Sequence, residues 1–448
     1  MNDDTCYAAM QSRDARFDGA FFVGVTSTGI YCRPICKVRI PKRENCRFFT
    51  HAAVAEGLGF RACLRCRPGL APKDAAMRWT NEDASKTLAQ QALQLIDRSG
   101  GELSVVEVAA KMGISDRHLR RIFAAHWGLT PQAYSKARLA HKPHSHWPAK
   151  PLLLQLPLHL PYDHAHMLKF FATRAIEGVE HVDAQQRLWR SIRLGAGRKT
   201  QTGWICADLS AKTKNTLPIT ISASLVPVLP QLVPMLRAAF DLDAQPNAID
   251  ALLLADFPDT TGQRVPGCFD GFELTVRAIL GQQITVQAAR TLALRLVARF
   301  GEPLKNSEAS VNRLFPSAAV LARATPSDLG ELGIVRQRQT AILGLAQMVQ
   351  NGLDLSSKPR TPTELQATKD ALCAIKGIGE WTAAYVAMRA LRDPDSFPAG
   401  DVALQNALGT RQASVTKSAK EAEAQSAKWQ PWRSYAVLRA WQRLEKST

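Results

Sequence analysis

The sequence contains no run of about 20 consecutive apolar residues, which a membrane-spanning helix would need. The leucine-rich run Leu152–Leu160 is short and is interrupted by Pro157. The first residues, MNDDTCYAAM, are acidic and lack the apolar core of a secretion signal. We therefore expect a cytoplasmic protein with no membrane partner, in a compartment where disulfides do not form.

Acidic residues are scarce relative to basic ones. The 448 residues include 57 Lys and Arg against 39 Asp and Glu, which gives a formal net charge of +18. With membranes set aside, this excess predicts nucleic acid as the partner. A hydrophobic content of 46% and a charged content of 21% are typical of a globular chain rather than a disordered one. The length is sufficient for more than two domains.

The nine cysteines must then be explained by metal binding or by chemistry. Four of them form two close pairs, namely Cys32 with Cys36 and Cys63 with Cys66. Two such pairs are what a tetrahedral zinc site needs, and zinc would keep the four sulfurs deprotonated at neutral pH. The spacing alone favours a purely structural zinc ion.

Helical patterns occupy residues 80–140. A helical stripe in Ala84–Asp97 is followed by LSVVEVAAKMGISDRHLRRIFAAHWGLTPQAYSKARLA, which predicts a helix, a turn at Gly113 and a second helix capped by Ser115. A small helical linker with solvated arginines is the alternative interpretation. The second helix carries four candidate DNA contacts: Arg117, His118, Arg120 and Arg121.

From Leu152 the pattern changes to strands. The runs LLLQLPLHL, RLWRSIRL, GWICADL and LPITISASL, with one helix at Tyr162–Ile176, predict a sheet with a helix packed on it up to about residue 225. A helical region begins near Val226 and continues to the C terminus. Within it, FDGFELTVRAILGQQITVQAARTLALRLVARFG predicts two amphipathic helices, the second ended by Gly301.

The segment LCAIKGIGEWTA, Leu372–Ala383, places a Gly-x-Gly turn between two helical patterns. Gly377 and Gly379 permit a tight turn, and the amides at the start of the next helix can bind an anion. On this basic chain the expected anion is a nucleic-acid phosphate, although a plain helix–helix connection has the same pattern. Shortly afterwards, FPAGDVALQN places one carboxylate, Asp401, ahead of an apolar run, where it could also serve as a helix N-cap.

These motifs resemble the helix-hairpin-helix DNA glycosylase superfamily, most closely its AlkA-type 3-methyladenine branch. IKGIGEWTA matches the hairpin, Asp401 the aspartate, and KWQPWRSYAVLRAW the closing helix. The resemblance implies that Gly377, Gly379 and Thr382 hold the DNA backbone, and that Asp401 stabilises a cationic sugar after base flipping.

Further site residues follow from the same resemblance. Gln283 matches the residue that wedges into the DNA stack, although it is polar here rather than aliphatic. Trp381, Tyr385 and Trp441 match the aromatic pocket for a cationic base, and Phe170 is a further candidate. Packing in the core is the alternative for each aromatic residue.

The first part of the chain, FDGAFFVGVTSTGIYCRPICKVRIPKRENCRFF and GFRACLRCRP, resembles the methylphosphotriester methyltransferase domain of the Ada family. The resemblance implies one zinc ion held by all four paired cysteines, with Cys32 taking a methyl group from a DNA phosphotriester. It also implies that nearby basic residues hold the DNA backbone: Arg33, Lys37, Arg39, Lys42, Arg43 and Arg47.

The helical segment at 80–140 resembles an AraC-type helix-turn-helix, whose second helix enters the major groove. That family carries two such units, whereas here Ala140 is followed by HKPHSHWPAKPLLLQL. We interpret residues 141–151 as a Pro-broken linker, natural or left by a deletion or shifted reading frame, rather than as a histidine metal site.

Three features found in relatives are missing. Trp381 stands where lyase members of the superfamily have a lysine nucleophile, so the expected glycosylase is monofunctional. No cysteine follows Cys373, which excludes the C-terminal iron–sulfur cluster of some relatives. The Pro-Cys-His-Arg motif of alkylguanine transferases is also missing.

The expected fold class is a multidomain α+β protein. Its expected parts are a small four-cysteine zinc domain (1–75), a helix-turn-helix module (80–140), a linker (141–151), an AlkA-like antiparallel sheet with helices (152–225) and an all-α glycosylase domain (226–448).

The expected function is repair of alkylated double-stranded DNA, by excision of 3-methyladenine-type bases through Asp401 and by suicidal methyl transfer to Cys32. Promoter DNA is a further expected partner, and the chain is expected to be a monomer. The alternative is a DNA-binding regulator without enzymatic activity. Asp401 and the aromatic pocket residues speak against it, because binding the DNA backbone needs neither.

Overall fold

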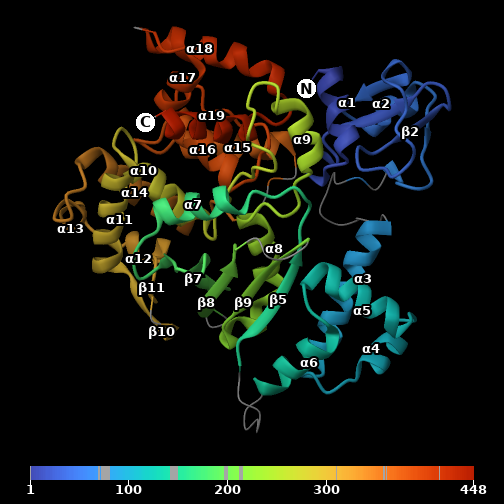
Figure 1. Cartoon of the computed structure of the whole chain (residues 1–448), viewed down its shortest axis with the longest axis horizontal. Helices are drawn as coiled ribbons and strands as arrows, with labels where there is room; N and C mark the ends of the chain where they lie inside the picture. Colours follow the sequence, from blue (N-terminus) through green and yellow to red (C-terminus); the bar gives the residue numbers. More distant parts are fainter. Residues whose placement is uncertain are drawn as a thin grey trace.

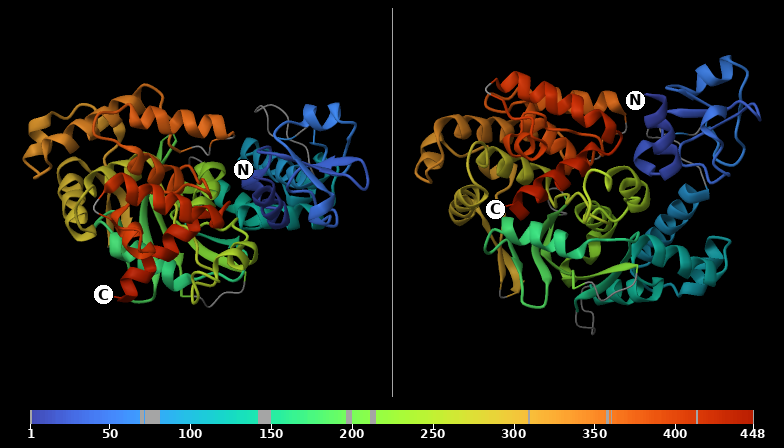
Figure 2. Two further views of the ribbon diagram at one scale, coloured as in Figure 1. Left: turned by 90° about the horizontal axis from the view of Figure 1, so that it is seen from above. Right: turned by 45° about the horizontal axis from the view of Figure 1, so that its top comes forward.

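The computed structural model describes residues 2–68, 71, 81–141, 150–195, 200–210, 215–308, 310–356, 359, 361–412 and 414–447. An N-terminal module (2–71) and a helical module (81–141) lie on one side of a larger body formed by the rest of the chain (Figure 1). Two further views show the same arrangement (Figure 2). In the described part of the chain, no helix is both long enough and apolar enough to cross a membrane.

The N-terminal module contains short strands. They form a four-stranded sheet in the order β3-β1-β2-β4, antiparallel except for the β2–β4 pair. Its elements are α1 (Asp3–Ser12), η1 (Ala15–Phe17), β1 (Phe22–Val25), β2 (Ile30–Cys32), η2 (Arg43–Asn45), β3 (Cys46–Phe49), α2 (Ala52–Gly57) and β4 (Arg61–Ala62).

The helical module contains the predicted helix-turn-helix. Ser104 forms a capping box with Glu107 at the start of the first helix, Gly113 makes the turn at a φ of +66°, and Ser115 caps the second helix. Residues 72–80 and most of the predicted linker 141–151 lie outside the described residues. The module consists of α3 (Asn81–Arg98), α4 (Val105–Lys111), α5 (Asp116–Trp127) and α6 (Pro131–Ala140).

The body begins with a five-stranded antiparallel sheet in the order β5-β9-β8-β7-β6. The four predicted strands are present, and the sequence pattern missed only the three-residue strand β6. The predicted helix is α7, bounded by Asp163 as its N-cap. The elements are β5 (Leu152–Pro157), α7 (His164–Arg174), β6 (Glu180–Val182), β7 (Arg187–Leu194), β8 (Gln201–Asp208), β9 (Thr216–Ile221) and η5 (Ala223–Val228).

The helical module packs directly on this sheet. The backbone N–H of Gln155 on the edge strand β5 donates to the carbonyl of Gly128 at 2.6 Å. Gly128 has a φ of +72°, and a Cβ there would lie 2.7 Å from Leu156, so the contact requires glycine. Phe123 and Trp127 belong to the same buried cluster as the sheet residues Leu154 and Leu156. The helix-turn-helix is therefore fixed to the body.

Among its described residues, the rest of the body contains helices and one hairpin. Its helices are α8 (Leu229–Ala239), α9 (Pro246–Leu253), α10 (Gly271–Leu280), α11 (Val286–Phe300), α12 (Ala318–Leu321), α13 (Pro326–Gly330), α14 (Arg336–Gln350), α15 (Pro362–Cys373), α16 (Glu380–Arg389), α17 (Val402–Leu408), α18 (Val415–Ser426), η6 (Ala427–Trp429) and α19 (Arg433–Ser447).

The hairpin β10 (Glu302–Glu308) and β11 (Val311–Leu314) corrects the expectation of an all-α domain. Leu304, Val311 and Leu314 are buried against Trp204 on the sheet. The segment has few apolar residues of its own, so contact with the sheet determines its structure, which local periodicity does not reveal.

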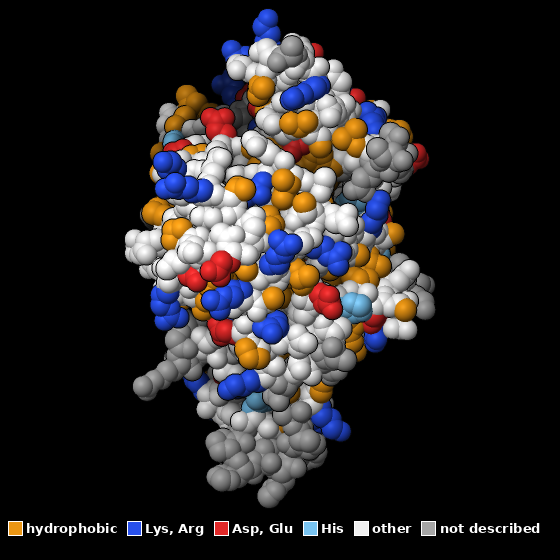
Figure 3. Space-filling view, turned by 90° about the vertical axis from the view of Figure 1, so that its left-hand side faces the viewer, with side chains coloured by type: hydrophobic (Ala, Val, Ile, Leu, Met, Phe, Trp, Pro, Cys, Tyr) orange, Lys and Arg blue, Asp and Glu red, His pale blue; other side chains and the backbone are white. Residues whose placement is uncertain are grey.

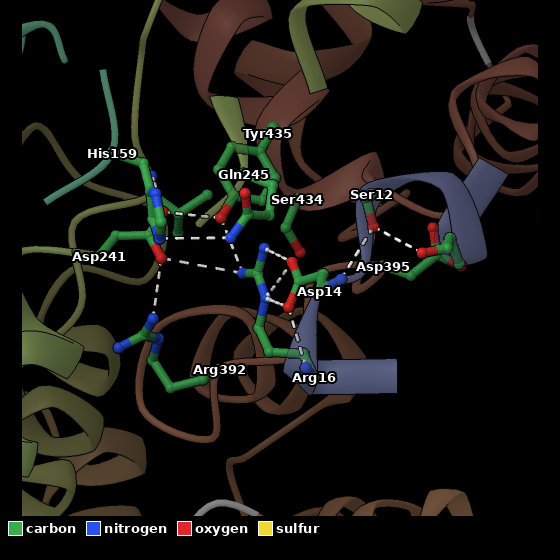
Figure 4. A network of polar contacts seen from close by, with 12 residues as sticks. Ser12, Asp14, Arg16, His159, Asp241, Gln245, Arg392, Asp395, Ser434 and Tyr435 are labelled. Carbon is green, nitrogen blue, oxygen red and sulfur yellow. Dashed lines mark hydrogen bonds and ion pairs between the residues drawn. The ribbon is translucent and has the colours of Figure 1, made fainter. Parts of the chain in front are cut away.

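The N-terminal module shares a buried polar network with the body (Figure 4). Arg16 donates to Asp14 at 2.6 Å and to the hydroxyl of Tyr435 on α19 at 2.7 Å. Tyr435 in turn donates to Asp241 at 2.7 Å, and Arg392 pairs with Asp241 at 2.8 Å. The side chains of Asp14 and Asp241 are each 1% exposed, so both carboxylates are buried.

Apolar side chains surround this network. Met10 and Phe17 of the N-terminal module lie in one buried cluster with Ile249 of α9 and with Trp429 and Trp432 near α19. The rings of Phe17 and Trp432 meet edge to face, with centroids 6.3 Å apart. The two parts therefore share a hydrophobic core rather than meeting at a loose surface contact.

Candidate active site

A cavity of about 1330 Å³ opens in the body between α7, α10, α11, the α15–α16 hairpin, α17 and α19. All nine of the predicted glycosylase residues line it: Phe170, Gln283, Gly377, Gly379, Trp381, Thr382, Tyr385, Asp401 and Trp441. Segments that are far apart in the sequence thus meet at one site. The structure places all of these predicted residues together.

Asp401 is the N-cap of α17 and also faces the cavity. Its Oδ1 accepts the backbone N–H of Leu404 at 2.6 Å and the indole N–H of Trp441 at 3.1 Å. Its Oδ2 accepts the indole N–H of Trp381 at 2.7 Å. Three donors therefore orient the carboxylate, which caps the helix as foreseen and also faces the cavity.

Aromatic rings form the wall beside Asp401. Trp381 and Tyr385 are four residues apart on α16, so they lie on one face of the helix. Their rings stack with centroids 5.5 Å apart and planes at 10°. The ring of Trp441 follows at 6.3 Å from Tyr385. All three side chains are half-buried, so they are not simply core residues.

Phe170 also lines the cavity, but its ring already has partners. The guanidinium of Arg174 lies 3.8 Å from the ring centroid, and that of Arg389 lies 4.6 Å from it. The ring of Phe170 thus makes cation–π contacts with both guanidinium groups. In the described part of the chain no such pair lies over Trp381, Tyr385 or Trp441, although Arg389 also lies over the ring of Tyr385, 5.3 Å from its centroid.

The hairpin has the geometry of an anion site. Gly377 has a φ of +95°, and a Cβ there would lie 3.1 Å from the carbonyl of Gln337, which favours glycine on both counts. Gly379 is the N-cap of α16, and no side chain caps this helix. The first amides of α16 are thus left for an external partner, at the positive end of the helix dipole.

Thr382 does not have the position predicted for a DNA contact. Its side chain is 1% exposed and accepts a hydrogen bond from Nε2 of Gln282 at 3.1 Å. The same Nε2 donates to the carbonyl of Gly377 at 3.0 Å. Thr382 therefore ties the hairpin to the α10–α11 loop, and Gln282, which the sequence did not single out, makes this connection.

Gln283 is exposed at the tip of the α10–α11 loop. Its φ of +58° lies in the left-handed region, which a non-glycine residue rarely adopts. Strain of this kind is retained where a side chain must project in a particular direction. This placement suits the wedge predicted from its position.

The face of the body that carries α11 and α13 bears basic side chains scattered among acidic and apolar ones (Figure 3). Exposed arginines on α11 and α14 contribute to it: Arg290, Arg295, Arg299 and Arg336. Exposed arginines are a residue type that contacts the DNA backbone.

The four paired cysteines also come together. Their Sγ atoms lie within 4.8 Å of one another, all four residues are buried, and the Sγ atoms of Cys36 and Cys63 are 4.0 Å apart. Sulfurs about 3.8 Å apart are expected around a tetrahedral zinc ion, given Zn–S bonds of about 2.3 Å. The backbone N–H of Arg33 donates to Sγ of Cys66 at 3.3 Å, as is usual for a metal thiolate. The cluster therefore fits one zinc ion.

Arg33 corrects an expectation. It is 1% exposed, and its Nε donates to Asp18 at 2.8 Å, so it supports the cysteine loop and cannot hold DNA. Arg43 pairs with Asp4 at 2.8 Å. The other basic side chains of this group are exposed: Lys37, Arg39, Lys42 and Arg47.

On α5, three of the four predicted DNA contacts are exposed: Arg117, Arg120 and Arg121. His118 is half-buried, and its Nδ1 lies 3.0 Å from Nη2 of Arg121. The opposite end of α5 packs on β5, so the arginine-bearing end points away from the sheet.

Sequence reasoning missed the charged groups of the cavity. Arg190 and Arg277 form a closed square of ion pairs with Glu180 and Glu273, which joins the sheet to α10. Arg389 lies four residues after Tyr385, and that helical spacing was the one available signal for its place beside the pocket.

Comparison with known proteins accounts for most of the chain. Residues 5–69 match the metal binding domain of Ada, 153–270 the AlkA N-terminal domain, and 276–432 the HhH-GPD superfamily base excision DNA repair protein family. The Escherichia coli protein named DNA-3-methyladenine glycosylase 2 is 34% identical over 63% of this chain and 94% of its own length. The structure of a 3-methyladenine DNA-glycosylase from Archaeoglobus fulgidus covers 65% of this chain and 98% of its own, with a TM-score of 0.54 and 19% identity, which supports the fold alone.

A Mycobacterium tuberculosis protein, named as a probable bifunctional transcriptional activator/DNA repair enzyme AlkA, is 32% identical over 99% of this chain and 97% of its own length. That alignment spans 506 positions although this chain has 448 residues, so the relative contains stretches that this chain lacks. The chain therefore belongs to the family of bifunctional proteins in which an Ada-type zinc domain is fused to an AlkA-type DNA glycosylase.

Proposed function

We propose that this protein repairs alkylated DNA at two sites, by excising bases at the cavity and by accepting a methyl group at the cysteine cluster. The observation that carries the first activity is the carboxylate of Asp401, held by three donors beside stacked aromatic rings. An uncapped helix start in the adjacent hairpin supports DNA as the substrate.

Base excision follows from the charge of the damaged base. Alkylation at N3 or N7 makes a purine cationic, so the base leaves as a neutral molecule once its bond to the sugar breaks. Asp401 stabilises the cationic sugar that remains, and water then adds to it. The faces of Trp381, Tyr385 and Trp441 receive the cationic base. Because tryptophan cannot form an imine, the strand is not cleaved by this enzyme.

Hairpin and wedge position the DNA for this reaction. The amides after Gly379 bind a backbone phosphate, and Gln283 enters the stack where the damaged nucleotide has left it. Gly377 adopts a φ of +95°, which favours glycine, and without a side chain it lets the DNA backbone approach the hairpin closely. Hydrogen bonds from Gln282 to Thr382 and to the carbonyl of Gly377 fix the hairpin and the α10–α11 loop relative to each other.

Methyl transfer takes place at Cys32. Bound zinc would keep the thiols of the cluster as thiolates. The sulfur of Cys32 attacks the methyl carbon of a methylphosphotriester, the S–C bond forms as the C–O bond breaks, and the phosphodiester leaves as an anion. The apolar side chains Met10, Val23 and Val38 line a small hollow beside Cys32, which suits a methyl group.

The partner is double-stranded DNA, and we propose that the exposed arginines of α5 add contacts to it, including at promoter DNA. Both reaction sites are formed by one chain, so we propose that it acts as a monomer. Its place of action is the cytoplasm of the cell whose DNA it repairs.

One experiment tests both activities together. The intact protein, loaded with zinc, is incubated with duplex DNA that carries 3-methyladenine and methylphosphotriesters. We expect free base in solution and a protein mass increased by one methyl group. DNA binding with neither product would identify the chain as a regulator without enzymatic activity.

A further inference from the structure

Gln282 is the residue directly before the exposed Gln283, and its side chain is held by the hairpin. Its Nε2 donates to the carbonyl of Gly377 at 3.0 Å and to the hydroxyl of Thr382 at 3.1 Å. Because only the NH2 group of an amide can donate to a carbonyl, the contact with Gly377 fixes the orientation of this amide. Both N–H groups of Gln282 are therefore used on the hairpin, 95 and 100 residues further along the chain.

The backbone of Gln282 is held by a third element. Arg338, in the first turn of α14, donates from its Nη2 to the carbonyl of Gln282. The start of α14 also packs on the hairpin, since a Cβ on Gly377 would lie 3.1 Å from the carbonyl of Gln337. The α10–α11 loop, the hairpin and the start of α14 therefore meet at Gln282, and these contacts form a junction between the three elements.

Gln283 differs from its neighbour in every respect. It is exposed, and in the described part of the chain no hydrogen bond or ion pair holds its side chain. Its backbone has a φ of +58°, a conformation that persists in a non-glycine residue only where the surrounding structure imposes it. Gln282 fixes the chain on one side, and Thr285, the N-cap of α11, fixes it on the other. The loop thus has a rigid base and a free tip.

Such a base matters for the step that precedes bond cleavage. Extruding a nucleotide breaks its stacking and its base pair, so the extruded state is sparsely populated unless the protein offsets this cost. The protein must hold the DNA backbone and fill the gap in the stack at the same time. The hairpin and Gln283 can do both only at a fixed separation. Contacts that join the two loops therefore raise the extruded fraction without touching the bond that breaks.

Building on the proposed glycosylase function, we propose that Gln282 and Arg338 are positioning residues for nucleotide extrusion, which couple the phosphate contact of the hairpin to the entry of Gln283 into the DNA stack. The rate of base release is the extruded fraction multiplied by the rate of bond cleavage. Gln282 and Arg338 act on the first factor, whereas Asp401 acts on the second. A nucleotide that is already unpaired therefore depends on the junction less than a paired one.

The test measures single-turnover release of 7-methylguanine by the full-length protein from two duplexes. In one duplex the lesion is paired with cytosine, and in the other it lies opposite an abasic-site analogue, so that no base pair has to be broken. Gln282→Met keeps most of the side-chain volume and loses both donors. Arg338→Met loses the donor to Gln282, and Arg338→Lys keeps one. The matched control is Gln347→Ala, at an exposed glutamine further along α14.

We expect each methionine variant to slow release from the paired duplex roughly tenfold or more, and release from the unpaired duplex less than about threefold, because only extrusion loses hydrogen bonds. Arg338→Lys should restore part of the loss, and Gln347→Ala should change neither rate. A 2-aminopurine beside the lesion reports extrusion directly, since its fluorescence rises when its neighbour leaves the stack. With cleavage stopped by Asp401→Asn, that rise should be smaller in the methionine variants.

Failure of this assignment differs from failure of the proposed function. If the parent protein releases no 7-methylguanine from either duplex, the glycosylase function itself is wrong. If the parent is active and the methionine variants slow both duplexes by the same factor, the junction is only structural, and the glycosylase function stands. The assignment also falls if Arg338→Met binds an undamaged duplex more weakly and with lower salt dependence, because Arg338 would then be a phosphate contact.

Discussion

The indole N–H of Trp381 donates a hydrogen bond to Oδ2 of Asp401 at 2.7 Å. The ring proposed to receive the base is thus connected directly to the carboxylate proposed to stabilise the sugar. Trp381 also lies in the first turn of α16, just after the hairpin turn. One short segment of chain therefore carries the proposed base and phosphate contacts and orients the carboxylate proposed for the sugar.

Replacing Trp381 by phenylalanine separates two of these roles. Trp381→Phe keeps an aromatic face for the base and removes the donor to Asp401. Because hydrogen bonds to charged groups contribute about 1.5–3 kcal/mol, we expect single-turnover release of 3-methyladenine to slow roughly ten- to a hundredfold. Trp441→Phe removes the longer bond to Oδ1, at 3.1 Å, and should cost less. Equal rates for Trp381→Phe and the parent would show that the bond does not orient the carboxylate.

Asp401→Asn should abolish most base release and leave DNA affinity nearly intact. Loss of one positioned electrostatic stabiliser costs about 3 kcal/mol or more, on the order of a hundredfold in rate. Asparagine is also a good N-cap, so α17 should remain folded. Base release is measured under single-turnover conditions and affinity by titration of a lesion-containing duplex. Release at the parental rate would remove Asp401 from the mechanism.

Cys32→Ala should prevent methyl uptake and also weaken zinc binding, because it removes one of four sulfurs. Cys63→Ala is the matched control, since it weakens zinc binding without removing the acceptor. Zinc content is measured for both variants. Peptide mass spectrometry of the parent protein after exposure to methylphosphotriester DNA then locates the methyl group, and its presence on any other cysteine would contradict the assignment.

Arg16→Met should destabilise the N-terminal module and the body together. The substitution removes the cation between Asp14 and Asp241, both 1% exposed, and breaking a buried pair typically costs about 3–5 kcal/mol. We expect the parent to unfold in one transition and the variant to unfold in one transition at lower denaturant, followed by fluorescence and zinc release. Arg43→Ala breaks an exposed pair with Asp4 and should change little. Two separate transitions in the parent would show that the shared core does not couple the parts.

Methyl-stimulated, sequence-specific promoter binding should be weak or lost in this protein, while both repair reactions persist. One helix-turn-helix is present in the described part of the chain, and the interval between Ala140 and Leu152 is too short for a second. A missing unit forfeits base contacts of about 1–3 kcal/mol each and several phosphate contacts, which lowers the salt dependence. Titrations of methylated and unmethylated protein with specific and random duplexes measure this. A tight, methylation-dependent preference with steep salt dependence would show that one unit is sufficient.

The residues that sequence reasoning placed correctly depend on local spacing. A few neighbouring residues are enough to recognise each of three motifs: two close cysteine pairs, a Gly-x-Gly turn, and an aspartate ahead of a helix. In the structure these form the cysteine cluster, the helical hairpin and the N-cap of α17. Residue types with several uses were harder to place. Arg33 was expected at the surface, but it is buried and donates a hydrogen bond to Asp18. Thr382 was expected to contact DNA, but its side chain accepts a hydrogen bond from Gln282.

What the sequence could not provide depends on contacts between distant segments. The hairpin β10–β11 is stabilised by packing on the sheet, and nothing in its own pattern indicates that sheet. Arg16 meets Tyr435, 419 residues away, and Arg389 meets Pro266. Periodicity assigns each of these side chains to an element, but only the assembled fold determines which ones meet.

The core shared by the N-terminal module and α19 has a consequence for how much of each activity a cell must synthesise. In the proposed function, each molecule takes up a single methyl group at Cys32, whereas its Asp401 serves one base after another. Because Met10 and Phe17 are built into the same core as Trp432, a molecule with a spent acceptor cannot shed it and stay intact. Each newly made chain therefore provides one methyl acceptor and one glycosylase site, so the two are always synthesised in equal numbers. A cell that renews the first must synthesise the second, whichever lesion is the more abundant.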